Sequence, residues 1–401
     1  MRILVVYPYI PYPVDRGTYQ RTFHLLRSLA RDHEVDLLAL SEDGERCEQK
    51  PIFAEFCRRV EFVPFQHPQW PRLFPDRLLS PLPTTVRHWL LPQVAASIDQ
   101  FAAGAKYDLA HVCDIVMAQY FFNGLSHLPL AVDRSRVDLQ FQLAQREAMS
   151  RGARQALLDW ENLIKLKRFE KRVARRVAVE VVCGPDDETF IRQQISRDVP
   201  VQVVTNGVDL DYFQASAVPD TRAVEPTVLF CGAMDYTPNV DALRWYFSEI
   251  HDALRQRIPD LRMLIVGKSP APEVLDHAQR PGVTVTGGVP DVRPYYRRAW
   301  LQLVPLRIGG GTRLKIPESM AMGTPVVSTT IGAQGLDLAE GHDILLADTP
   351  GQFVEATARA LTDPALRAHL EDHGGRTVRA RLAWPMLGKQ LSNYYEQRFK
   401  N

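Results

Sequence analysis

The stretch that decides the fold is VPLRIGGGTRLKIPESMAMGTPVVSTT, residues 304–330. It starts at the end of an apolar segment, 300–306, which runs directly into three consecutive glycines. A short helix opened by Pro317 and ended by Gly323 is expected next, followed by a second apolar segment, 326–330. Strand, glycine loop, helix and strand in this order predict one βαβ unit.

The loop after the first strand has a composition suited to anion binding. It contains small residues and two cations, namely Gly309, Gly310, Gly311, Thr312, Arg313 and Lys315. Glycines let the backbone approach a ligand closely, and N–H groups at a helix start bind phosphate or diphosphate. Because Pro317 suits the first helical turn, we expect both cations to lie in the loop and fold over the ligand.

Two features of this stretch have alternative explanations. Glu318 either complements the helix dipole or accepts two hydroxyls of a sugar. The glycines alone could form only a tight connection between strand and helix. The loop matches neither GxxxxGK[ST] nor GxGxxG, so neither of these common nucleotide-binding fingerprints applies.

Composition indicates an ordinary soluble globular protein. The chain has 401 residues, of which 45% are hydrophobic and 24% charged, enough for two domains with separate cores. A net charge of +1 gives no general attraction to nucleic acid. The five cysteines form no CxxC pair, and no histidine clustering suggests zinc, so we expect reduced cytoplasmic thiols. The opening MRILVVYPYIPYP does not resemble a signal peptide, and no apolar stretch is long enough to span a membrane.

The first half of the chain also begins as βαβ. An apolar strand at 2–7 precedes a proline-rich loop that ends at Gly17, and a helix and a second strand follow. Asp133 ends a later strand. Ligands of open α/β sheets gather outside the carboxyl ends of the strands, so Gly17 and Asp133 are expected on the functional edge.

Residues 165–176, KLKRFEKRVARR, hold seven basic residues against one acid, Glu170. A charge run of this kind is usually a solvated helix face. The alternative is a basic surface that contacts anionic lipid on the cytoplasmic face of a membrane.

A polar, proline-bearing segment at 214–226 indicates a domain boundary. We predict an N-terminal domain at 1–213 and a second at 214–385, with a last helix at 386–401 that can pack on either. Strands alternate with helices in both parts, which predicts two Rossmann-like domains whose parallel sheets face across a cleft.

Four motifs resemble retaining GT-B glycosyltransferases of family four, of the bacterial polysaccharide-assembly type. They are NGVDLDYF at 206–213, the glycine loop stretch, GTYQRTFHLLRSLARDHEVDLLAL from Gly17, and GGVPDVRPYYRRA at 287–299. The resemblance covers nearly the whole chain. It implies transfer of a sugar from a nucleotide diphosphate sugar to a glycan or lipid-linked acceptor, with retained configuration and without a metal or other cofactor.

The resemblance also implies roles for single residues. Glu318 matches the family glutamate that binds the ribose, and the two loop cations neutralise the diphosphate leaving group. Backbone that approaches the phosphates, sugar and base is expected at four positions: Gly17, Gly232, Gly288 and Val289.

This sequence departs from the family pattern at three places. Gly310 stands where a first glutamate would hold the donor sugar. The segment GAMDYTPN at 232–239 lacks the family's arginine and lysine, so Arg313 and Lys315 are expected to replace them. Asp133 stands where many members have an active-site histidine, with Asp138 nearby; it either positions the sugar or acceptor hydroxyl, or caps the next segment.

Two other functions stay open on sequence alone. One is a non-catalytic GT-B protein that binds a nucleotide or glycan, because the first glutamate is missing. The other is a sugar-nucleotide epimerase, which needs no acceptor. A dehydrogenase is disfavoured because no GxGxxG follows an early strand of either domain.

Overall fold

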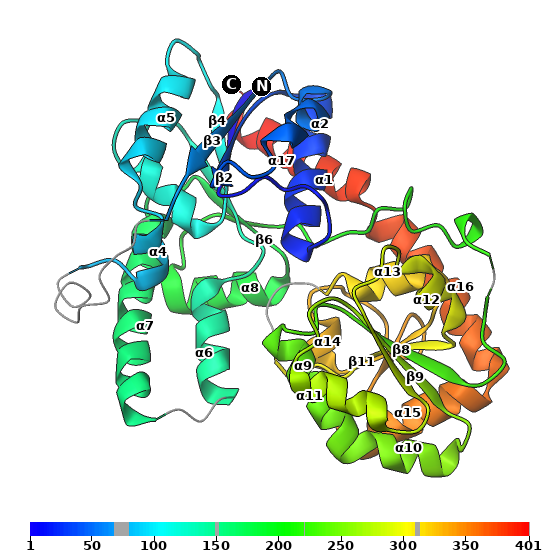
Figure 1. The fold of residues 1–401 in the computed structure, drawn as a ribbon. Coiled ribbons are helices and arrows are strands. Elements are labelled where there is room, and N and C mark those ends of the chain that lie inside the picture. The colour runs from blue at the N-terminus through cyan, green and yellow to red at the C-terminus, as the bar shows by residue number, and fades with distance from the viewer. Residues whose placement is uncertain (68–79, 149–151, 220, 309–312, 401) are drawn as a thin grey trace. The chain divides into compact units, whose positions relative to one another are not determined.

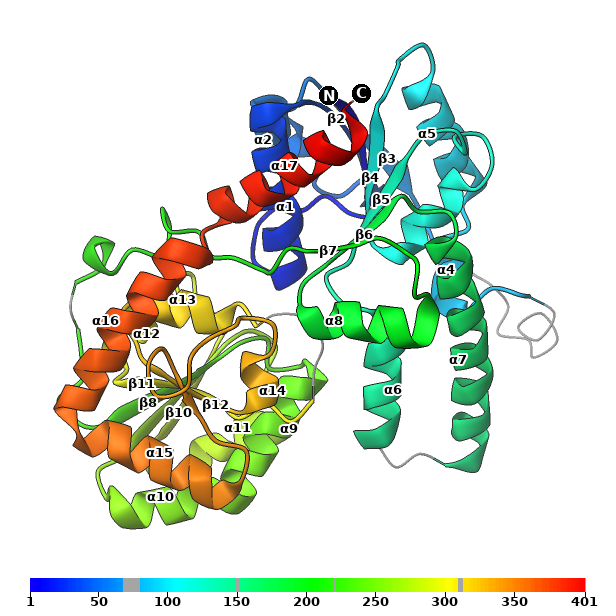
Figure 2. The same cartoon turned by 180° about the vertical axis from the view of Figure 1, so that it is seen from behind.

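A computed structural model of the chain describes residues 1–67, 80–148, 152–219, 221–308 and 313–400. The chain divides into two compact units, unit 1 at 1–205 with 385–401, and unit 2 at 206–384. Each unit is built on one parallel sheet (Figures 1 and 2). The α/β class with two Rossmann-like domains is therefore confirmed.

In unit 1 the described strands follow the order β3-β2-β1-β4-β5-β6-β7. Their bounds are β1 Arg2–Tyr7, β2 Glu34–Glu42, β3 Arg59–Phe65, β4 Leu109–Cys113, β5 Leu130–Asp133, β6 Val179–Val182 and β7 Val201–Val203. β1, RILVVY, is buried on both faces, which is why its residues form one apolar run without alternation.

Helices cover this sheet. They are α1 Gly17–Asp32, α2 Lys50–Ala54, α4 Thr84–His88, α5 Pro92–Ala102, α6 Asp138–Ala148, α7 Ala153–Ala174, α8 Pro185–Phe190 and α17 Trp384–Phe399. The last of these returns to unit 1, where Lys389 and Ser392 both bind Asp32 at the end of α1. Gly388 allows the contact, because a Cβ there would lie 2.1 Å from Ser28 Cβ.

In unit 2 the described strands follow the order β10-β9-β8-β11-β12-β13. They are β8 Thr227–Cys231, β9 Arg262–Val266, β10 Val283–Gly287, β11 Leu301–Val304, β12 Val326–Ser328 and β13 Leu345–Leu346. The helices are α9 Thr237–Trp245, α10 His251–Arg257, α11 Pro272–Asp276, α12 Arg293–Arg298, α13 Lys315–Ala321, α14 Thr330–Ala333, α15 Pro350–Thr362 and α16 Pro364–Arg381. α10 packs on α15 and α13 packs on α16 (Figures 1 and 2).

The expectation that Lys315 lies in the loop is wrong, because α13 begins at Lys315 and places Pro317 at its third position. The first four N–H groups of a helix lack intrahelical acceptors, so proline is tolerated there as well as at the first position. Lys315 and Glu318 are consequently three residues apart on one helix, a spacing that brings their side chains to one face.

None of the helices within the described ranges combines the length and hydropathy that a membrane span requires. The five cysteines are all free thiols, and Cys47 alone among them is exposed.

Candidate functional site

The strands of unit 2 end at a row of glycines that brings backbone segments into close contact. Gly232, Gly267 and Gly287 end or follow β8, β9 and β10, and their φ angles are +153°, +159° and +69°. Gly232 N donates to the Val266 carbonyl, and Gly267 N donates to the Gly287 carbonyl. A Cβ on Gly267 would lie 1.6 Å from the Gly232 carbonyl oxygen, so only glycine fits there.

Lys315 lies at this edge beside Gly232. Its Nζ donates to Asn239 Oδ1 at 2.8 Å and stands 4.4 Å from the centre of the Phe230 ring. A Cβ on Gly232 would lie only 3.1 Å from the same nitrogen. Burial, together with the charge of Arg313, lowers the pKa of Lys315 to about 8 against the opposing effects of Cys231 and Glu318.

Glu318 is buried one turn further along α13. The Tyr296 hydroxyl donates to its Oε2 at 3.1 Å. Burial raises the pKa of Tyr296 well above its usual value, and the neighbouring Cys231 and Glu318 add to the effect, so the hydroxyl stays a donor. Two of the predicted donor-binding side chains, Lys315 and Glu318, are thus brought together with Gly232.

The glycine loop itself lies outside the described residues. It contains four of the predicted site positions, Gly309, Gly310, Gly311 and Thr312. Its two flanks are described. Arg307 Nη2 and Nε bind the carboxylate of Asp241 on α9 at 2.6 and 3.1 Å. Arg313 Nη2 donates to the Ile331 carbonyl at 3.3 Å. Both flanking arginines are therefore attached to the body of unit 2.

The predicted base-binding residues follow β10. Gly288 is exposed, and a Cβ there would lie 3.5 Å from Cβ of Lys268, while Val289 packs partly buried against the core of unit 2. Lys268 follows Gly267 at the same edge, and its carbonyl accepts from Met234 N. Lys268 is a third cation at this edge and was not predicted from the sequence. Its position directly after the glycine that follows a strand could have indicated it.

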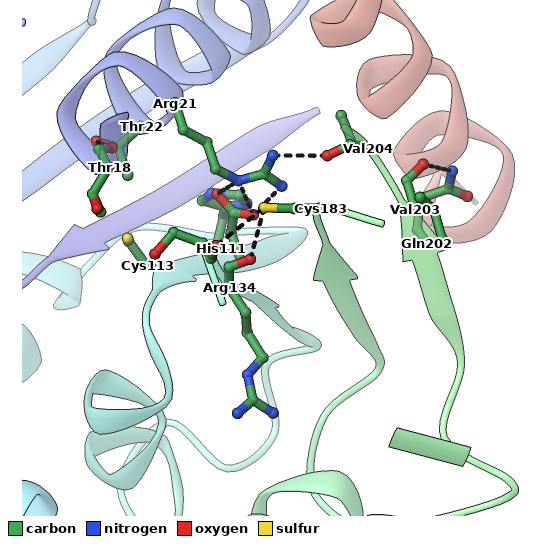
Figure 3. A network of polar contacts seen from close by, with 12 residues as sticks. Thr18, Arg21, Thr22, His111, Cys113, Arg134, Cys183, Gln202, Val203 and Val204 are labelled. Atoms are coloured by element: carbon green, nitrogen blue, oxygen red, sulfur yellow. Dashed lines mark hydrogen bonds and ion pairs between the residues drawn. The ribbon is translucent and has the colours of Figure 1, made fainter. Parts of the chain in front are cut away.

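In unit 1, Asp133 is fully buried and bound by Arg21 of α1. Arg21 Nη2 donates to Asp133 Oδ1 at 2.6 Å, and Nε donates to the same oxygen at 2.9 Å. Arg21 Nη1 donates to the Val204 carbonyl at 2.7 Å (Figure 3). Burial lowers the pKa of Arg21, but Asp133 more than offsets this and holds it above the usual value. The ion pair fastens α1 to the ends of β5 and β7.

Gly17, the other predicted site residue of unit 1, is exposed and is the first residue of α1. The residue at the neighbouring strand end, Asp114, was not predicted. It follows β4 with φ +72°, an unusual value for a residue with a side chain, and its carboxylate accepts from Ile115 N at 2.6 Å. Burial and the charge of Asp138 raise the pKa of Asp114 to about 6, although Arg134 and Arg136 oppose the shift.

A polar cavity of about 270 Å³ lies between α6 and α7 of unit 1. Its lining includes Arg136, Asp138, Gln142 and Asn162. Asp138, which lines the cavity, is also one of the charges that raise the pKa of Asp114.

Contacts within unit 1 involve several basic residues of 165–176. Lys165 pairs with Glu161, Arg172 lies over the Phe122 ring, and Arg176 donates to the carbonyls of residues 121, 125 and 128. Glu170 is buried against Arg134, with Oε2 at 2.7 Å from Nη1. These contacts favour the interpretation of the segment as part of a structural helix.

Comparison with known proteins finds similarity in unit 2. Residues 225–363 match the family described as glycosyl transferases group 1. This stretch includes Lys315 and Glu318. A phosphatidyl-myo-inositol mannosyltransferase of Mycobacterium tuberculosis is 30% identical over 207 residues, which cover 48% of this chain and 53% of that protein. The chain thus spans about half the length of the curated relatives it matches.

Solved structures match this chain along its whole length. Sucrose-phosphate synthase of Thermosynechococcus elongatus superposes with a TM-score of 0.74 at 20% identity and covers 100% of both chains. The Anabaena protein HepE, solved with UDP and glucose, gives 0.68 at 15% identity over 99% of this chain and 100% of its own. These matches confirm the GT-B fold that was expected from the sequence.

Proposed function

We propose that the protein is a glycosyltransferase that takes a sugar from a nucleotide diphosphate sugar bound to unit 2. The observation on which this rests most heavily is the position of Lys315. Its ammonium lies beside Gly232 at the carboxyl edge of the sheet, and Glu318 follows on the same helix. A cation and a carboxylate at this spacing suit the diphosphate and the ribose of a nucleotide.

The leaving group explains why cations are needed. Departure of a nucleoside diphosphate develops negative charge, which fixed cations and N–H dipoles stabilise without reorganisation. Lys315 supplies one cation, and Arg313, two residues earlier, supplies the second. With two cations at the leaving group, transfer proceeds without a metal, and we propose retention of configuration from the family resemblance.

The acceptor binds unit 1 in this proposal. Asp133 is unavailable to it, because Arg21 holds the carboxylate in the interior. Asp114 and the polar cavity with Arg136 and Asp138 offer groups that accept and donate hydrogen bonds to a hydroxylated acceptor. A glycan or lipid-linked glycan fits this chemistry, and the name of one relative, phosphatidyl-myo-inositol mannosyltransferase, supports a lipid-linked acceptor.

The donor assignment is tested by incubating the full chain with a panel of nucleotide sugars and following release of the nucleoside diphosphate. Release of the nucleoside diphosphate is expected for one combination of base and sugar, by transfer to an added acceptor or by hydrolysis when no acceptor is present. A binding protein without activity would retain the nucleotide sugar unchanged, and an epimerase would convert the sugar with no release of diphosphate. Proton NMR of the transferred sugar reports whether its anomeric configuration is retained.

Lys315→Met provides the matched variant for this assay, because it keeps an unbranched side chain of similar length next to Phe230 while removing the charge. Lys106→Met is its control, since Lys106 is an exposed lysine of unit 1. Turnover should be lost in the first variant and kept in the second.

A further inference from the structure

Three histidines meet on unit 2, away from the glycine row. His342 precedes β13, and His369 and His373 lie on α16, where a spacing of four residues places them on one helix face. One ligand nitrogen from each lies within 4.8 Å of the other two. The ring centres are 3.9 Å apart for His342 and His373, and 4.3 Å apart for His369 and His373.

We propose that His342, His369 and His373 bind a zinc ion. Zinc takes imidazole nitrogens at about 2.0–2.1 Å in tetrahedral geometry, so ligand nitrogens around it stand roughly 3.4 Å apart. The separation of these three is at most 4.8 Å, and small rotations of exposed side chains close the difference. Three protein nitrogens leave the fourth position of a tetrahedral zinc to water.

A carboxylate orients the first of these ligands. Asp343 Oδ1 lies 3.2 Å from His342 Nδ1, which leaves Nε2 of that ring to face the metal. Asp343 is itself held, because Oδ2 accepts from Ala339 N at 2.9 Å and Oδ1 accepts from Thr377 Oγ1 at 2.8 Å. Carboxylate, histidine and metal in this order are typical of zinc centres, and Asp343 is a positioning residue in the proposed site.

The backbone brings the two ligand-bearing segments together before any metal binds. Gly374 lets α16 approach the segment before β13, since a Cβ there would lie 3.1 Å from the Asp343 carbonyl oxygen. The same Cβ would lie 3.3 Å from Met320 Cγ on α13. Zinc would therefore fasten the His342 segment to α16, the helix that packs on α13.

The site is separate from the proposed transfer chemistry. His342 lies before β13, at the amino edge of a parallel sheet, whereas Gly232 and Gly267 lie at the carboxyl edge. The zinc would stabilise unit 2 and take no part in transfer. Chelation should accordingly lower the melting temperature and leave the turnover of folded enzyme intact.

The test uses the full chain without a histidine tag, dialysed against a chelator and titrated with Zn²⁺ alone in competition with a chromophoric chelator. We expect one equivalent to bind and to raise the melting temperature by about 5 °C at saturation. His369→Ala and His373→Ala should each weaken binding at least tenfold, and the double variant should abolish it. All three histidines are at least partly exposed, so these variants should fold.

His127→Ala is the control, because His127 is an exposed histidine of unit 1, and its zinc affinity should equal that of the parent. Asp343→Asn should weaken zinc binding to the folded protein about tenfold, because the carboxylate positions His342. If Asp343 only stabilised the fold, the zinc affinity of the folded variant would equal that of the parent. Absence of a bound equivalent in the parent would overturn the proposal. So would an unchanged zinc affinity in the His369→Ala/His373→Ala variant.

Discussion

Unit 1 and unit 2 both place an acid and a cation at the carboxyl edge of a parallel sheet, but they use them differently. In unit 1 Arg21 and Asp133 have side-chain exposures of 0% and 1% and bind each other directly. In unit 2 Lys315 is partly exposed, and its pKa is lowered to about 8. Arg21 and Asp133 are structural, because both side chains are buried and bind each other, and Arg21 also binds the Val204 carbonyl. Partial exposure of Lys315 at a glycine-lined edge leaves this second cation able to bind a ligand.

The largest effect is expected from Asp133→Asn, which leaves the guanidinium of Arg21 buried without its counter-ion. Breaking a buried ion pair in this way costs about 3–5 kcal/mol of unfolding free energy. Urea unfolding monitored by circular dichroism measures the loss. Asp108→Asn, which affects an exposed contact to Arg2 N, should cost less than about 1 kcal/mol. A stable Asp133→Asn protein that has lost transfer would instead make Asp133 a catalytic residue and remove the contrast.

Lys315→Met should produce the opposite pattern, a loss of activity without a loss of stability. Removing one cation from the leaving-group site should lower kcat/KM about a hundredfold, close to 3 kcal/mol. Steady-state kinetics and urea unfolding on the same preparation separate the two quantities. A drop of more than about 2 kcal/mol in unfolding free energy, with turnover per folded molecule retained, would place Lys315 with Arg21 among the structural cations.

Glu318→Gln sharpens the assignment inside unit 2. Glutamine keeps an oxygen that accepts from Tyr296, so stability should change little. Loss of the carboxylate charge, which makes Glu318 a strong hydrogen-bond acceptor for the ribose, should weaken nucleoside diphosphate binding about tenfold, or about 1.4 kcal/mol. The affinity for inorganic diphosphate should stay unchanged. Calorimetric titration with both ligands measures this. Equal losses for the two ligands would exclude a contact with the ribose.

The smallest effect concerns pH. A lysine whose pKa lies near 8 is mostly protonated at pH 7.5 and mostly neutral at pH 8.5, so diphosphate affinity should fall about threefold between them. Affinity is full below the pKa and is lost as pH rises through it. Lys315→Met should give a flat profile over the same interval, and a parent profile equally flat would contradict the lowered pKa.

Much of the fold follows from the sequence because buried parallel strands read as short apolar runs. The strand at 2–7 was expected with the bounds that the structure has, and Asp133, expected at a strand end, ends β5. The start of α13 was misplaced, since proline is compatible with several positions of a first turn. Lys315 and Glu318 were predicted from a local motif and Gly232 from the family resemblance, and Lys315 does lie beside the other two.

Other parts of the site depend on tertiary contacts that no local pattern shows. The partner of Asp133 lies 112 residues away on α1, and nothing in the sequence around Arg21 marks it as buried. The raised pKa of Asp114 requires Asp138 and burial. The histidine cluster combines His369 and His373, whose spacing is visible in the sequence, with His342 from a separate segment, so no local pattern predicted a zinc site.

The central claim is that the ammonium of Lys315 binds the diphosphate of the donor, and its own reactivity offers the most direct test. A partly exposed lysine with a pKa near 8 should react readily with an acylating reagent, and mass spectrometry reports the rate at each lysine. A nucleoside diphosphate, chosen from uridine, guanosine and adenosine forms by thermal shift, should slow modification of Lys315 at least tenfold and leave Lys106 unaffected. An unchanged rate at Lys315 with the nucleotide bound would contradict the account.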